Sequence, residues 1–233
     1  MPTTKKKPAA PTSPRAAKTA RRDPAKTRAG ILAAATAEFA AKGYSGARTE
    51  QIAKRAKSNI RMLYHYFGGK DALYLSVLEE ELARLRHDEL QLDFGDVEPL
   101  QGVVQLFDFI DDHFAAHPEL RCLLAFENLN RARHLKQSAR IRAMASPVIE
   151  LLAGLLKRGE QAGVFRPGID ALHLYVSMVS LAYYSKSHAY TLSRIFDTDL
   201  AAPAWQRAQR EQTHQMLASF LAVPLAARAR RAA

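Results

Sequence analysis

Cysteine is nearly absent from this sequence of 233 residues, in which Cys122 is the only one. A single cysteine excludes an intramolecular disulfide and any zinc site built from several thiolates, and such usage is typical of a reducing cytoplasm. We therefore expect a cytoplasmic protein with Cys122 as a buried, unreactive thiol. Long apolar runs are also absent. No stretch approaches the roughly 18 residues of a membrane span, and the N-terminus lacks the apolar segment of a secretory signal.

Acidic residues are missing from positions 1–22, which carry seven lysines and arginines. Positions 23–71 carry nine basic and four acidic residues, whereas positions 72–233 carry 18 basic and 19 acidic residues. The net charge of +11 therefore comes entirely from the first third of the chain. This asymmetry predicts that the N-terminal part binds a polyanion. A tail that only aids solubility would explain positions 1–22, but it explains the next segment less well. A transit peptide is a further alternative for the tail.

Strand signals are absent as well. No segment alternates polar and apolar residues with a period of two, and no Asn-Gly or Asp-Gly pair marks a hairpin. Apolar residues recur at helical spacing instead, which predicts an all-α fold. The expected helices cover about 24–43, 49–56, 60–66, 70–92, 98–116, a segment from 118, 146–162, 169–196 and 204–222. Positions 1–22 are expected to be disordered because they have little apolar bulk, and positions 225–233 form a second basic tail.

Two of the expected short helices, at 49–56 and 60–66, are separated by only three residues. So short a connection forces a sharp crossing, which is the geometry of a helix-turn-helix. In this motif the second helix presents its side chains to the major groove of DNA. Leu63 and Phe67 lie one helical turn apart and are expected to pack inside with Ile52.

The outward side of the second helix carries side chains suited to DNA. Arg61 can pair in bidentate fashion with guanine, and Met62 can contact a thymine methyl group. Tyr64 and His65 can bind the backbone phosphates. The alternative is that these aromatic side chains cover a neighbouring helix, and for Tyr66 we favour that alternative.

The stretches "EQIAKRA" and "LYHYFGGKDAL", together with the helix that precedes them, resemble the N-terminal domain of TetR-family transcriptional regulators. The resemblance covers about residues 25–82. It implies a three-helix DNA-binding domain at 23–70, with a linking helix at about 70–92. It also implies a helical-bundle domain at 71–224, which binds a small effector and dimerises through its last two helices. When the family's DNA contacts are transferred position by position, the resemblance implies contacts from Arg48, Thr49, Asn59, Ile60, Arg61, Met62, Tyr64, His65 and Lys70.

The turn before the second helix departs from the family pattern. The family usually has Gly-Val-Ser where this chain has Lys57-Ser58-Asn59. If Lys57 is left-handed, it costs roughly 1 kcal/mol relative to glycine. Asn59 remains a good helix cap. The fold prediction stands, but the DNA sequence that this protein reads cannot be transferred from a relative.

The C-terminal part is less diagnostic. It resembles family members that respond to nitrogen heterocycles such as pyrimidines or pyridine carboxylates. A pocket inside a helical bundle needs apolar walls and a few convergent polar groups. Each aromatic or histidine at helical spacing can equally be part of the core. The candidate effector-binding residues are Phe107, His113, Phe126, Asn130, His134, Tyr175 and Met178.

Apolar seams on the last two expected helices predict a homodimer. A dimer also follows from DNA reading, because two-fold symmetry places two recognition helices on successive half-sites. The candidate interface residues are Tyr183, Trp205, Gln209, Met216 and Phe220.

The predicted function is a dimeric repressor that a small molecule releases from a palindromic operator. It is not expected to be an enzyme or to hold a metal or cofactor. One alternative is a helical metal-assisted hydrolase using Asp111, Asp112, His113, Glu127 and His134. Consecutive residues point to different faces of a helix, however, and no catalytic motif is present. The other alternative is a non-specific architectural DNA binder driven by the basic tail.

Overall fold

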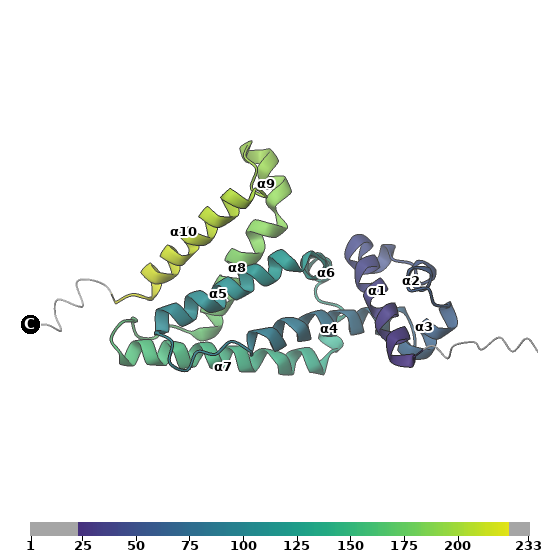
Figure 1. Ribbon diagram of the computed structural model, residues 1–233, viewed down its shortest axis with the longest axis horizontal. Helices are drawn as coiled ribbons and strands as arrows, with labels where there is room; N and C mark the ends of the chain where they lie inside the picture. Colours follow the sequence, from purple (N-terminus) through teal and green to yellow (C-terminus); the bar gives the residue numbers. More distant parts are fainter. Residues whose placement is uncertain (1–22, 224–233) are drawn as a thin grey trace, which may run out of the picture.

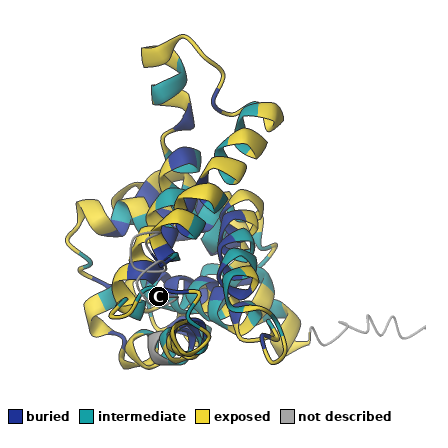
Figure 2. Cartoon of the chain, turned by 90° about the vertical axis from the view of Figure 1, so that its left-hand side faces the viewer, coloured by how far each residue is buried: buried dark blue, intermediate teal, exposed yellow. Residues whose placement is uncertain are grey.

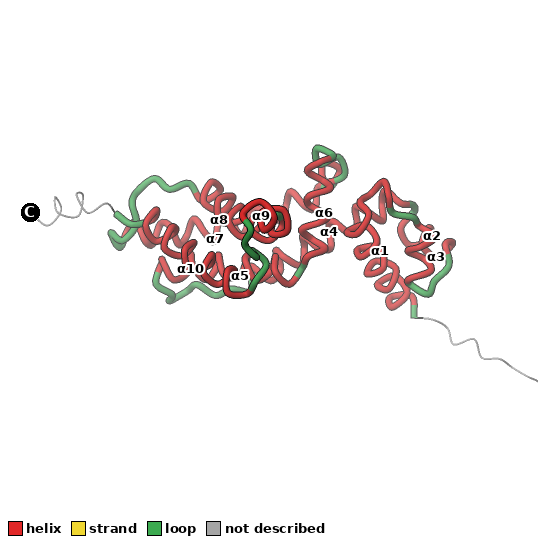
Figure 3. The backbone as a smooth tube through the Cα atoms, turned by 90° about the horizontal axis from the view of Figure 1, so that it is seen from above, coloured by secondary structure: helices red, strands yellow, loops and turns green. Residues whose placement is uncertain are grey.

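The computed structural model describes residues 23–223, apart from the side chains of residues 145 and 146. The predictions for positions 1–22 and for the basic C-terminal tail lie outside these residues. The prediction of an all-α fold is confirmed (Figures 1 and 3). The helices are α1 (Pro24–Gly46), α2 (Thr49–Arg55), α3 (Ile60–Phe67), α4 (Lys70–Glu89), α5 (Pro99–Ala116), α6 (Pro118–Leu129), the 3₁₀ turn η1 (Leu135–Gln137), α7 (Ala139–Gln161), α8 (Ala171–Ser187), α9 (Ala189–Phe196) and α10 (Pro203–Leu221).

The molecule is elongated, with α1–α3 at one end and the tip of α8, α9 and α10 rising from the other part (Figure 1). Its buried apolar residues form two clusters, one around α1–α3 and one around α5, α7 and α8. Helix α4 belongs to both, because Leu73 and Leu78 lie in the first cluster and Leu85 lies in the second. Most of the α9 tip is exposed (Figure 2). Helix α4 therefore connects the two cores rigidly.

Capping side chains set several helix ends, among them the predicted cap at Asn59. The side chains of Asp23, Asn59 and Asp170 each accept a hydrogen bond from a backbone N–H in the first turn of their helix, at 2.8–2.9 Å. Such caps satisfy donors that the helix leaves unpaired. Gly43, where α1 was predicted to end, has a φ of +66° and kinks the chain there.

Two predicted helices differ from the structure. The helix predicted at 146–162 begins earlier, because Ser138 caps it: Ser138 Oγ accepts from Ile141 N–H at 3.1 Å. Pro147 consequently lies inside α7 and not in its first turn. The single helix predicted at 169–196 is two helices, since His188 takes a non-helical conformation between α8 and α9.

Cys122 is exposed, so the prediction that it is buried is wrong. Helix α6 turns Leu120, Leu123 and Glu127 toward the interior. Cys122 lies between these positions on the outer side of the helix.

Candidate nucleic-acid interface

The turn between α2 and α3 has the left-handed residue that the sequence indicated. Lys57 has a φ of +49°. The reversal lets Ser58 N–H donate to Ala53 O at 3.0 Å, which satisfies a carbonyl at the end of α2. Asn59 Oδ1 then accepts from Met62 N–H at 2.9 Å and starts α3. The turn therefore fixes the direction in which α3 leaves α2.

Helix α3 divides into an inner and an outer side. Leu63 and Phe67 are buried with Ile52, as predicted. Arg61 and His65 are exposed, and Tyr64 is 48% exposed. The remaining three residues of interest on α3 are partly buried and pack against the core; they are Ile60, Met62 and Tyr66. The outer side of α3 is thus a cationic and aromatic strip formed by Arg61, Tyr64 and His65.

The residues flanking this strip add positive charge. Arg48 at the start of α2 is exposed, whereas Thr49 beside it is buried. Of the two, Arg48 is therefore the one whose side chain is free to bind a phosphate. Arg28 on α1 was missed by sequence reasoning, and its guanidinium lies 5.0 Å from the centre of the Phe67 ring. This residue gave no signal in the sequence because the packing of α1 on α3 is a tertiary contact.

Lys70 occupies the first turn of α4, after a break in the chain at Gly68 and Gly69. Gly68 is left-handed with a φ of +77°, and it lets the chain reverse between α3 and α4. The ammonium of Lys70 lies 4.7 Å from the centre of the Tyr44 ring, a cation–π contact. Tyr44 in turn donates a hydrogen bond to Asp71 Oδ1 at 2.6 Å. Lys70 is thus held beside the strip by a neighbouring aromatic residue.

Known proteins share this architecture. Residues 31–77 match the family described as bacterial regulatory proteins of the tetR family, and residues 99–217 match a tetracyclin repressor-like C-terminal domain. The chain is 39% identical over 176 residues to the HTH-type transcriptional repressor NicS of Pseudomonas putida, a match that covers 76% of this chain and 83% of that protein. The chain belongs to the TetR family. It is accordingly a DNA-binding transcriptional regulator.

Two further similarities extend over most of this TetR-family chain. The HTH-type transcriptional repressor SCO4008 of Streptomyces coelicolor is 34% identical over 168 residues, covering 71% of this chain and 81% of that one. The crystal structure of the transcriptional regulator SCO4942 from the same species superposes with a TM-score of 0.64 at 27% identity, over 82% of this chain and 97% of that one. Both helical domains are therefore those of TetR-family regulators.

The seven candidate effector residues of this TetR-family regulator do not come together in one site. Phe107, Tyr175 and Met178 lie in the core of the C-terminal domain. Phe126 instead packs against Gly43 of α1, where an added Cβ atom would lie only 2.9 Å from its ring. Asn130 is exposed, and its amide donates to Phe126 O at 2.7 Å. This second group, which includes His134, belongs to the junction of α6 with the DNA-binding domain, because the end of α6 docks on α1.

A buried polar cluster occupies the C-terminal core. Tyr175 donates to Glu89 Oε1 at 2.7 Å, and Arg86 donates to both Glu89 and Tyr175. Glu89 is fully buried, and burial raises the pKa of its carboxyl despite the guanidinium beside it. Burial likewise raises the pKa of the Tyr175 hydroxyl above its usual range. The cluster links the end of α4 to α8 with charged groups in an apolar surrounding.

His113 lies on α5 in the same domain and is 6% exposed. Burial, and then the neighbouring His117, lower the pKa of His113 to about 4. The two imidazole centres lie 4.2 Å apart. His113 is therefore neutral at pH 7, and a neutral imidazole both donates and accepts hydrogen bonds.

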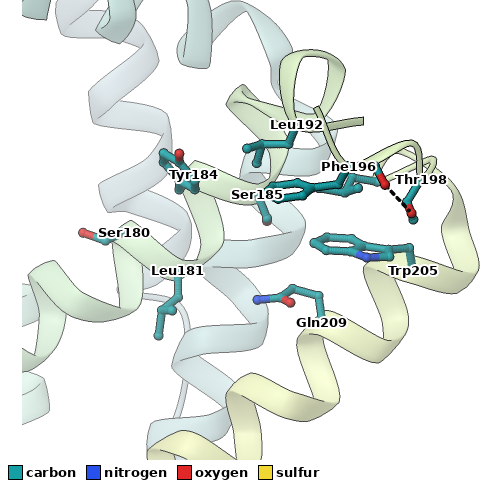
Figure 4. Close-up of a pocket in the computed structure, with 10 residues that line it drawn as sticks. Ser180, Leu181, Tyr184, Ser185, Leu192, Phe196, Thr198, Trp205 and Gln209 are labelled. Atoms are coloured by element: carbon teal, nitrogen blue, oxygen red, sulfur yellow. Dashed lines mark hydrogen bonds between the residues drawn. The ribbon is translucent and has the colours of Figure 1, made fainter. Parts of the chain in front are cut away.

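A cavity of about 760 Å³ lies at the tip formed by α8, α9 and α10 (Figure 4). Tyr184, Phe196 and Trp205 contribute aromatic rings to it, and Gln209 contributes an amide. No charged residue lines it, and the cavity touches none of the seven candidate effector residues. Two of the predicted interface residues, Trp205 and Gln209, line the cavity instead.

One predicted interface residue, Tyr183, faces the interior and not the surface. Its hydroxyl donates to Arg121 O at 3.2 Å, and its ring centre lies 5.4 Å from that of Phe114. The next residue, Tyr184, is 53% exposed in its place. Helix α8 thus carries aromatic side chains on both an inner and an outer face. The exposed large hydrophobic residues of the last three helices are Leu172, Val176, Tyr184, Tyr190, Ile195, Phe196, Met216 and Phe220.

The residues of the hydrolase alternative are separated by the fold. Asp111 and Asp112 on α5 bind Arg210 of α10. Glu127 and His134 pair with each other at the far end of α6. Within residues 23–223, no group of three or more His, Cys, Asp or Glu side chains is arranged to hold a metal ion. In the same part of the chain, no helix is both long and apolar enough to cross a membrane.

Proposed function

We propose that this TetR-family regulator is a homodimeric repressor in the cytoplasm, which binds a palindromic operator and releases it when a small molecule binds the C-terminal domain. The observation that carries the proposal is the exposed strip of α3, where Arg61, Tyr64 and His65 face away from both cores. A regulator that reads bases needs such a strip on a rigid helix.

The division of labour on the strip follows from side-chain chemistry. Arg61 reads a base edge through its guanidinium, and Met62 and Ile60 contribute apolar contacts at the groove. Tyr64, His65 and Lys70 bind phosphates, which fixes the register of the helix on the duplex without selecting sequence. Arg48 is well placed for a further phosphate contact, and Thr49 offers only its backbone N–H because its side chain is buried.

The dimer forms through α8 and α10. On α8 the exposed positions Leu172, Val176, Ser180 and Tyr184 repeat every four residues. On α10 the exposed positions Met216 and Phe220 have the same spacing. Two such helices from each protomer would form a four-helix interface that buries these stripes and covers the apolar cavity at the tip. Burial of these side chains supplies the free energy of association.

The effector binds within the C-terminal core, beside Arg86, Glu89 and Tyr175. These three residues present hydrogen-bond donors and an acceptor among apolar side chains, which suits a small nitrogen heterocycle with both kinds of group. Neutral His113 adds a group that can act in either role. Phe107 and Met178 supply apolar walls.

Release follows if the effector favours an arrangement of α4 that changes the distance between the two α3 helices of the dimer. Helix α4 is suited to this because it belongs to both cores. Linkage then requires that operator DNA weaken effector binding by the same factor.

The decisive experiment is selection of bound fragments from random DNA by the purified protein, with and without pyrimidines and pyridine carboxylates. We expect a palindrome whose half-sites lie about 34–36 Å apart or a multiple of that distance, and its loss with one ligand class. Enrichment of no palindrome would refute the dimeric reader. Deletion of residues 1–22 distinguishes the dimeric repressor from the architectural alternative. The alternative requires that this deletion abolish all DNA binding.

A further inference from the structure

The loop after α6 is fixed by one buried carboxylate, that of Glu127. Its Oε2 accepts from the backbone N–H groups of His134 and Leu135 at 3.1 and 3.2 Å. Its Oε1 pairs with His134 Nδ1 at 2.8 Å. Glu127 is 1% exposed and His134 is 3% exposed. A single side chain therefore holds the returning loop and the imidazole at its end.

The same loop is strained. Arg131 and Ala132 both have a φ of +55°, a left-handed conformation that residues other than glycine rarely adopt. This conformation is unfavourable for a residue with a side chain, and such strain persists only where the surroundings enforce it. Here Ala132 N–H donates to Glu127 O at 2.7 Å, so the strain is held by the residue that also holds His134.

The held imidazole is pressed against the DNA-binding domain. Its ring centre lies 4.5 Å from that of Tyr44 on α1 and 4.7 Å from that of Tyr74 on α4. Its Nε2 atom is buried without a hydrogen-bond partner and lies 3.9 Å from Asp71 Oδ1. Asp71 is the residue that accepts from Tyr44, and Tyr44 supports the ammonium of Lys70.

These contacts form a continuous chain from α6 to the DNA-contacting side of α4. We propose that Glu127 and His134, acting through Tyr44, are positioning residues for Lys70, so that the loop after α6 sets how tightly this regulator grips DNA phosphate. The proposal rests on the proposed role of Lys70 in phosphate binding. Strain in the loop and an unpaired buried nitrogen are both explained if the loop is retained for this positioning and not for stability alone.

The test is a double-mutant cycle on operator DNA obtained by the selection described above, with the full-length protein. Lys70→Ala should weaken binding roughly tenfold, as expected for a lost charged hydrogen bond. Glu127→Gln, which keeps the shape of the side chain and removes its charge, should weaken it severalfold. The double variant should bind within about twofold of Lys70→Ala alone, because interactions in one chain are not additive.

The salt dependence of DNA affinity is a second measurement, and a loss of folding stability alone would not change it. A plot of log K against log salt has a negative slope. Loss of one phosphate contact reduces the magnitude of this slope by about 0.9 for each bound protomer. Lys70→Ala and Glu127→Gln should both lower it. Tyr44→Phe, which removes only the bond to Asp71, should lower affinity in the same direction by a smaller factor. Thermal unfolding checks that each variant is folded.

Glu79→Gln is the matched control. Glu79 Oε1 accepts from Ser138 Oγ at 2.5 Å, so it also joins α4 to the chain before α7, at a position nine residues after Lys70 on the same helix. It should leave affinity and slope unchanged. Multiplicative effects of Glu127→Gln and Lys70→Ala, or an unchanged slope in Glu127→Gln, would overturn the positioning role. Wild-type affinity in Lys70→Ala would overturn it as well, whereas failure of the wild type to prefer any DNA would count against the proposed function itself.

Discussion

Arg210 on α10 grips Asp111 on α5, with its Nε and Nη2 atoms 3.0 and 2.6 Å from the same carboxylate oxygen. Lys186 of α8 donates to the other oxygen of Asp111. Asp111 is 6% exposed. One buried carboxylate therefore ties α5 to α8 and α10, the two helices that carry the proposed dimer face.

Asp111→Ala should lower the free energy of unfolding by about 3 kcal/mol, because it leaves two cations facing a buried space without their shared partner. Chemical denaturation at pH 7 measures this difference. The control is Asp112→Ala, which removes an exposed partner of the same arginine and should cost less than about 1 kcal/mol. Equal losses in the two variants would show that burial of Asp111 does not govern the network.

His113 predicts a pH dependence of stability. Its pKa in the folded chain is about 4, against 6.5 in the unfolded chain, so between these values the unfolded state binds more protons. Its contribution is therefore complete above pH 6.5 and is lost as the pH falls through 4, by roughly 3 kcal/mol in all. Nearby Asp88, Arg84 and Arg86 also act on this imidazole.

The measurement compares the wild type with His113→Gln from pH 4 to 7. The difference between them isolates the histidine, since Glu81 and Glu89 titrate in both proteins. We expect the variant to lose less stability on acidification. Parallel curves would mean that His113 is protonated in the folded protein well above pH 4.

Lys57 predicts a stabilising substitution. Because its φ of +49° is unfavourable for a residue with a side chain, Lys57→Gly should raise the free energy of unfolding by about 0.5–1 kcal/mol. The control is Lys54→Gly inside α2, which should cost up to about 1 kcal/mol since glycine disfavours a helix interior. Denaturant titration gives both values, and a loss of stability in Lys57→Gly would contradict the strain argument.

The DNA-binding end was predictable because its signals are local. The Asn59 cap and the four-residue spacing of Leu63 and Phe67 both act within about one turn of chain, and both appear in the structure as expected. A short amphipathic helix has one way to bury its apolar side. Elimination then left Arg61, Tyr64 and His65 on the outer side, where they lie, but it also left Met62 there, which is partly buried against the core.

The C-terminal domain was less predictable because its signals are tertiary. Helix α8 is apolar on several faces, so periodicity could not decide between Tyr183 and Tyr184. His134 was assigned to an effector pocket on its residue type, but the docking of α6 on Gly43 places it at the domain junction. Arg86 and Glu89 gave no signal, since a charged pair on a long helix normally faces solvent.

Arg61 and Tyr64 should separate base reading from backbone binding. Arg61→Ala should relax the preference at one base position in each half-site, where the bidentate contact is worth about 1–3 kcal/mol. Tyr64→Phe should weaken binding to all sequences alike, because the proposed partner of its hydroxyl is a phosphate and not a base. Repeating the DNA selection with each variant checks both. If Arg61→Ala instead lowers the affinity for all sequences equally and leaves the selectivity at every base position unchanged, Arg61 does not read a base.

The exposed apolar stripes predict where the dimer can be broken. Tyr184→Glu combined with Met216→Glu places two charges in each protomer on surfaces that the proposed interface would desolvate, so the dissociation constant should rise at least about thirtyfold. Sedimentation at micromolar concentration should then show a monomer, and binding to a palindrome should fall with it. The control is Leu129→Glu, which changes an apolar residue that is 80% exposed and belongs to the end of α6 that docks on α1, not to α8 or α10. If the doubly charged variant still sediments as a dimer while Leu129→Glu does not, the interface lies on α6 and the distance between recognition helices is set by a different face.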